Sequence, residues 1–205
     1  MIGSWSYLRR ALLVALIVWG FWPAGRGDDE QRPPGLGERL LGPVSSLASS
    51  AIWVRFDLAL REGEPARAYA LAERALELDP GAWQGWSSLG LHLVFERGSG
   101  ESELDLAERR RWIRAGLAVL QRGAGRARRP GELHLLEGVV LAAHIAPRAD
   151  ELGWPGGASA ALRAALPELD RAVELGIERA PLLAEEARQL LAGLDTGGPG
   201  APQGR

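Results

Sequence analysis

The segment from Ala68 to Leu93 constrains the fold more than any other part of this chain. Its first half reads Ala-x-x-x-Ala-x-x-Ala-Leu-x-x-Asp-Pro, which places three alanines on one helix face, where a partner helix can approach closely. Pro80 ends that helix because proline has no amide hydrogen to donate. The second half, Trp-x-x-Leu-Gly-x-x-Leu, begins at Trp86 and starts the next helix with a large anchor and a gap for its neighbour. The segment therefore predicts the seam between two helical hairpins.

These residue types at these offsets resemble the tetratricopeptide repeat, whose unit is about 34 residues long. One unit would run from Ser49 to Ala82, and a second would begin at Trp83. The first unit departs from the pattern at Arg55 and Phe56, where leucine and glycine are usual. The specific match covers residues 49–93. The resemblance implies stacked helical hairpins that form a binding surface.

Helical periodicity extends well beyond the matched segment. It predicts seven helices, at residues 44–62, 65–78, 83–97, 104–122, 132–146, 159–175 and 180–194. The small-residue pattern recurs at Ala165 and Ala172, and the last helix carries leucines that would cap the open end of the stack. We therefore predict an all-α domain over residues 44–194, a short tetratricopeptide-like superhelix of about three hairpins plus a capping helix.

Residues 1–25 have the pattern of a membrane signal. Arg9 and Arg10 precede an uncharged apolar run at 11–24, and three acidic residues follow at 28–30, an order that keeps the arginine end in the cytoplasm. The run is shorter than the ~20 residues that usually span a bilayer, but flanking aromatic residues extend it. Cleavage after Ala24 or Gly25 would place a bulky residue or a proline where a small residue is needed. We expect an uncleaved signal anchor rather than a removed signal peptide.

This anchor predicts a single-pass protein of a bacterial inner membrane, with its C-terminal domain in the periplasm. Glycine, proline and charged residues dominate residues 26–43, which predicts a linker between the anchor and the domain. Residues 195–205 are rich in glycine and proline, which predicts a disordered tail.

Charge and cysteine content exclude several functions. Three of the 24 basic residues lie in residues 1–27, so the remaining 21 face 26 acidic residues and give that part a net charge of −5. A net negative charge does not favour binding to the phosphate backbone of a nucleic acid, so we expect no nucleic-acid partner. The chain has no cysteine, which rules out disulfides and thiolate metal sites.

The sequence contains no glycine-rich phosphate loop and no nucleophile elbow, so we predict no catalytic residue and no cofactor. His134, Glu137 and His144 share one face of a predicted helix and are the residues to consider as metal ligands. However, the two histidines lie about 15 Å apart along the helix axis, so one metal ion cannot contact both. We predict no metal site, and a metal-dependent enzyme is the weakest of three hypotheses.

In tetratricopeptide proteins the first helix of each repeat lines a concave groove. The resemblance implies that the matching positions here form a groove suited to an extended peptide or an amphipathic helix. These positions are Trp53, Asp57, Leu60 and Arg61 in the first repeat and Gln84, Ser87, Leu91, Val94 and Phe95 in the second. The alternative is that these side chains pack against the chain itself.

Together these features predict a membrane-anchored adaptor that binds a protein or peptide partner and is not an enzyme. The alternative is a structural accessory subunit of a bacterial envelope or secretion complex, in which the repeats pack against fixed neighbours. The sequence specifies no oligomeric state.

Overall fold

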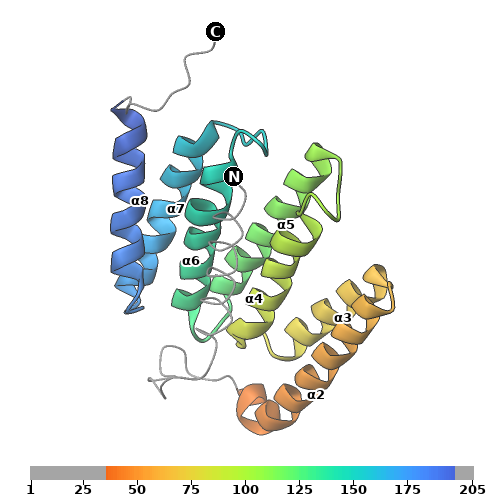
Figure 1. The fold of residues 1–205 in the computed structure, drawn as a ribbon. Coiled ribbons are helices and arrows are strands. Elements are labelled where there is room, and N and C mark those ends of the chain that lie inside the picture. The colour runs from red at the N-terminus through yellow and green to blue at the C-terminus, as the bar shows by residue number, and fades with distance from the viewer. Residues whose placement is uncertain (1–35, 197–205) are drawn as a thin grey trace. The chain divides into compact units, whose positions relative to one another are not determined.

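The computed structural model describes residues 36–196, with side chains from residue 44 onward. The predicted anchor at 1–25 and all but the first two residues of the predicted tail lie outside this part of the chain. The described residues form seven α-helices: α2 (Leu36–Arg61), α3 (Pro65–Leu78), α4 (Trp83–Leu91), α5 (Leu106–Ala124), α6 (Pro130–Val139), α7 (Gly157–Glu174) and α8 (Ala180–Asp195) (Figure 1). The prediction of an all-α domain is confirmed.

The helices pack as sequential pairs along the chain (Figure 1). Helix α2 pairs with α3, α4 with α5, and α6 with α7, while α8 packs on α7 at the C-terminal end of the stack. Two π-helical turns, η1 (His92–Arg97) and η2 (Val140–Ile145), continue α4 and α6, and a short 3₁₀ turn, η3 (Ala146–Arg148), follows η2. The pairs arise because each helix buries an apolar face against its neighbour.

Helix boundaries follow local signals in the sequence. Gly63 ends α2 with φ of +75°, a left-handed conformation that glycine adopts without a Cβ clash. Pro65 then occupies the first turn of α3, where its missing amide hydrogen costs nothing. The Asp105 carboxylate caps α5 by accepting hydrogen bonds from the backbone N–H groups of Ala107 and Glu108, at 2.7 and 2.9 Å.

The predicted linker is wrong over residues 36–43, because α2 begins at Leu36. The glycines and the proline of this stretch indicated a linker, although five of its residues are good helix formers, at 36, 38, 39, 40 and 41. Once the following turns are fixed by packing against α3, extending a helix adds one hydrogen bond for each residue ordered. The rest of the predicted linker, at 26–35, lies outside the described residues.

The predicted seam between the first two pairs is confirmed. Ala68, Ala72 and Ala75 are fully buried on α3. Trp86 is 3% exposed, and its indole Nε1–H donates a 2.9 Å hydrogen bond to the carbonyl oxygen of Pro80. Ala68, Ala72 and Trp86 belong to one apolar cluster that also contains Phe56 of α2, so the cluster ties the first pair to the second.

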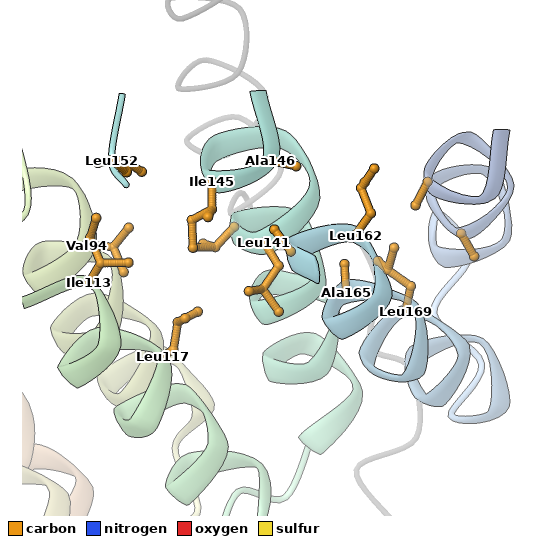
Figure 2. Close-up of a cluster of buried hydrophobic side chains, with 14 residues drawn as sticks. Val94, Ile113, Leu117, Leu141, Ile145, Ala146, Leu152, Leu162, Ala165 and Leu169 are labelled. Atoms are coloured by element: carbon orange, nitrogen blue, oxygen red, sulfur yellow. The ribbon is translucent and has the colours of Figure 1, made fainter. Parts of the chain in front are cut away.

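A second apolar cluster holds the C-terminal pairs together (Figure 2). Val94 of η1 and Ile113 of α5 form one side of it, and Leu162 and Leu169 of α7 form the other. Side chains of η2 fill the space between them, including the fully buried Ile145. Leu91 is partly buried and packs against both clusters, so the core is continuous along the stack.

None of the helices within residues 36–196 is both long and apolar enough to cross a membrane.

Candidate functional site

The nine residues predicted to line a concave groove have very different environments. Asp57, Arg61 and Gln84 are exposed. Trp53, Leu60, Leu91 and Phe95 are half-buried, whereas Ser87 and Val94 are buried.

The groove prediction is wrong for Ser87 and Val94, because neither can reach a partner. The Ser87 hydroxyl donates a 2.8 Å hydrogen bond to the carbonyl oxygen of Gln84, which lies on the same helix. Val94 lies in the C-terminal apolar cluster, where it contacts the glycine position of α5 at Gly116. The positional pattern marks a helix face but does not say which part of that face the next pair covers.

The half-buried aromatic residues of the predicted groove are used in packing between helices. The Trp53 ring fits over Gly85 of α4, where an added Cβ would lie 3.0 Å from the ring. Phe95 of η1 meets His144 of η2 edge to face, with ring centroids 4.5 Å apart. Both rings therefore contact neighbouring helices of the chain itself.

An open hollow lies instead between α3 and α5, with a volume of about 370 Å³. We call it the α3–α5 groove. It is lined by Tyr69, Glu73, Leu89, Leu93, Trp112, Ala115, Ala118, Val119 and Arg122. Leu89, Leu93 and Val119 are buried and form its floor. Its size is at the lower end of the range of ligand pockets, which suits the side chains of a docked segment.

Small residues of α5 keep this groove open. Ala115 and Ala118 have no side chain beyond Cβ, so they leave the leucines of the second pair accessible from the space between α3 and α5. At one end the rings of Tyr69 and Trp112 meet with centroids 6.1 Å apart. The guanidinium carbon of Arg97 lies 4.9 Å from the centre of the Trp112 ring, a cation–π contact that fixes the indole.

Opposite charges flank the groove. Glu73 projects from α3 and Arg122 from α5, and both are exposed. Neither forms a hydrogen bond or an ion pair among residues 44–196. The two side chains are thus available to polar groups of a segment laid along the apolar floor.

Leu89 and Leu93 belong to the Trp-x-x-Leu-Gly-x-x-Leu motif, but the motif predicted packing for them, and no residue of this groove was predicted to bind a partner. Tyr69 directly follows the first small residue of the α3 seam, and Trp112 interrupts an arginine-rich stretch, so each marked the edge of a buried face. That signal was available, but the shape of the groove depends on how far α3 lies from α5. The spacing of apolar residues along α3 or along α5 does not determine the distance between the two helices.

The three residues considered as metal ligands do not converge. His134 Nδ1 lies 2.7 Å from Oε2 of Glu168 on α7, whereas His144 contacts Phe95 and Arg148. No group of three or more residues that could hold a metal ion occurs in the part of the chain that the structure describes.

Glu137 is the one carboxylic acid that α6 buries in the apolar interior. It is 2% exposed, and the side-chain amide of Gln121 on α5 donates a hydrogen bond to it. Burial, together with the negative charge of Glu168 across the α6–α7 contact, raises the pKa of Glu137 to about 7, against an ordinary 4.5. The Gln121 hydrogen bond and the charge of His134 oppose this change without cancelling it.

Glu137 should make the folded protein less stable as the pH rises from about 5 to about 7. In this range the unfolded chain has already released the proton that the folded chain still holds, so the free energy of unfolding falls, by up to about 3 kcal/mol. Glu137→Gln keeps an acceptor for Gln121 and cannot ionise. Urea unfolding should show the variant more stable than the parent at pH 8 and equal to it at pH 5.

The matched control for this titration is Glu186→Gln, at an exposed carboxylate of α8. It should leave the difference between pH 5 and pH 8 unchanged. An equal pH dependence in the parent and in Glu137→Gln would show that Glu137 ionises in the folded protein as it does in water.

Comparison of the chain with family models, with curated proteins and with solved structures finds no match. The tetratricopeptide-like resemblance of residues 49–93 thus stays a prediction from the sequence.

Proposed function

We propose that this protein is a membrane-anchored helical-repeat adaptor that binds a protein partner and catalyses no reaction. The apolar run at 11–24 supports the anchor, and the repeat-like spacing at 49–93 supports the scaffold. The same anchor supports a location at a bacterial inner membrane, with the helical domain in the periplasm. The α3–α5 groove is the observation that carries the binding role.

The shape and chemistry of this groove suit an amphipathic helix better than a small molecule. The residues that α5 contributes run from Trp112 to Arg122, about 15 Å along the helix axis, or nearly three turns. An apolar floor between two helices accepts side chains at helical spacing, as in other helix-in-groove complexes. Glu73 and Arg122 would then select a helix with a basic residue on the α3 side and an acidic residue on the α5 side.

A photo-crosslinking amino acid placed at Ala118, an exposed position of the groove, tests this role in native membranes. We expect one discrete adduct with a second protein. Ala115→Arg would fill the groove, and we expect it to reduce that adduct at least tenfold while the melting temperature stays close to that of the parent. The matched control is the same crosslinker at Glu101, an exposed loop residue, which should give no adduct.

The alternative function, a structural accessory subunit, is favoured by one observation. Both ends of the stack expose large apolar side chains, among them Leu47 on α2 and Leu190 on α8. A crosslinker at Leu190 therefore discriminates between the two functions. A stoichiometric adduct at Leu190 without one at Ala118 would support the subunit and contradict the adaptor.

A further inference from the structure

Helix α2 has two apolar faces, although it packs on only one side among the described residues. Its inner face holds Phe56 and Ala59, which are buried against α3 and α4. On its other face Val44, Leu47, Val54 and Leu58 are between 53% and 72% exposed. We call these four residues and the exposed Ala51, which lies on the same face, the outer stripe.

The outer stripe has the geometry of a contact surface. Its members recur at intervals of three and four residues, which places them on one side of the helix, opposite Phe56. From Val44 to Leu58 the stripe is about 21 Å long. Arg55 and Arg61 border it on opposite sides. The outer face of a terminal repeat helix is usually polar, since nothing stacks upon it, and a continuous apolar stripe there indicates a partner.

The chain itself restricts what that partner can be. Eleven residues, 25–35, separate the apolar run that ends at Ala24 from the first residue of α2, Leu36. Fully extended, they span about 40 Å, and as a flexible linker they span about 20 Å on average. If the run is inserted in a bilayer, α2 cannot leave the neighbourhood of that bilayer. Such a short tether gives an effective concentration near the millimolar range, at which a weak affinity for the surface is enough.

We propose that the outer stripe of α2 lies in the interfacial region of the same bilayer that holds residues 11–24. This inference rests on the membrane anchor of the proposed function. The leucine and valine side chains enter the boundary between headgroups and acyl chains, as in amphipathic surface helices. Arg55 and Arg61 extend along the two borders of the stripe toward lipid phosphates, with their aliphatic stems against the apolar side chains.

A second copy of this chain is the competing partner for the stripe. The bilayer has one advantage over it that follows from the tether. The lipid surface is adjacent to α2 in every molecule, whereas a second copy must be recruited at a cost that depends on its concentration in the membrane. Contact with lipid also fixes the orientation of the helical domain relative to the bilayer, because α2 belongs to the same packed stack as the α3–α5 groove.

The absence of native cysteine makes a clean test available. The full-length chain is reconstituted into vesicles of phosphatidylethanolamine and phosphatidylglycerol, with a single cysteine carrying the environment-sensitive dye NBD at position 47 or 54. We expect the NBD emission to shift to the blue at both positions, and nitroxide-labelled lipids to quench most of it. The matched control, a label at the exposed Glu186 of α8, should show neither effect.

A variant separates the stripe from the anchor. Val54→Asp changes an exposed side chain, so it should leave the melting temperature unchanged. We expect it to abolish lipid quenching of the label at position 47 while the protein stays in the vesicles. Retention of that quenching in Val54→Asp would contradict contact through the stripe.

The remaining outcomes distinguish the two proposals. Incorporation into vesicles with no blue shift at 47 or 54 would overturn the interfacial position of α2 and leave the anchor intact. A blue shift that grows with the protein-to-lipid ratio and resists lipid quenching would assign the stripe to a second copy instead. Failure of the full-length chain to enter vesicles would overturn the anchor itself, and the lipid contact with it.

Discussion

Trp86→Ala should lower the free energy of unfolding by about 3–5 kcal/mol, the usual cost of removing a buried tryptophan. The side chain is 3% exposed, and its ring lies against Gly123 of α5, where an added Cβ would be 2.5 Å from the ring. Truncation opens a cavity in the cluster that joins the first pair to the second. It also leaves the carbonyl oxygen of Pro80 without its 2.9 Å hydrogen bond.

Differential scanning calorimetry measures this effect. At roughly 2–4 °C per kcal/mol for a domain of this size, the melting temperature should fall by roughly 6–20 °C. Trp86→Phe is the matched control, since it keeps most of the ring and loses the hydrogen bond to Pro80. Its cost should be nearer to 1–3 kcal/mol, about that of leaving one buried acceptor unpaired. An unchanged melting temperature for Trp86→Ala would mean that the indole is exposed in solution.

Residues whose environment is set within one hairpin could be predicted from the sequence. The alanines of α3, Pro80 and Trp86 lie within 19 consecutive positions, and their roles depend on helical spacing and on the chemistry of proline. The bounds of α3, Pro65–Leu78, were predicted in full because a glycine and a proline frame its start and a second proline follows its end. Local rules are reliable where local signals agree with one another.

Features that depend on how two pairs meet could not be predicted in this way. The α3–α5 groove exists because α5 presents Ala115 and Ala118 to a space that α3 does not fill. The same alanines would be buried if α3 lay closer. Ser87 and Val94 failed as groove residues for the converse reason, because neighbouring helices cover the part of the face on which they lie.

The exposure of the outer stripe of α2 could not be predicted from the sequence either. Leu47 lies within the helix predicted at residues 44–62, and it is 72% exposed. Apolar periodicity alone does not separate two apolar faces on one helix, since both repeat at helical spacing. The structure separates them because α3 packs on one face, whereas the side chains of the other face are exposed among the described residues.

Helices α4 and α5 approach each other closely at a pair of glycines, Gly90 and Gly116. A Cβ at position 116 would lie 2.5 Å from the carbonyl oxygen of Gly90 and 2.6 Å from a methyl carbon of Val94. The first of these is a backbone atom, so a side-chain rotation cannot relieve the clash. The Val94 methyl group also belongs to a close-packed cluster that leaves it little room to move.

Gly116→Ala should therefore destabilise the protein by about 3 kcal/mol or more, because α4 and η1 must move away from α5. The sign of the effect is diagnostic, since helix propensity alone predicts that alanine in place of a helical glycine stabilises by about 1 kcal/mol. The matched control is Gly193→Ala in α8, where nothing lies within 4 Å of the added Cβ. Urea unfolding should show a loss for position 116 and a gain for position 193. A gain at both positions would mean that α4 and α5 do not pack through their glycines, and that the second pair holds together in some other way.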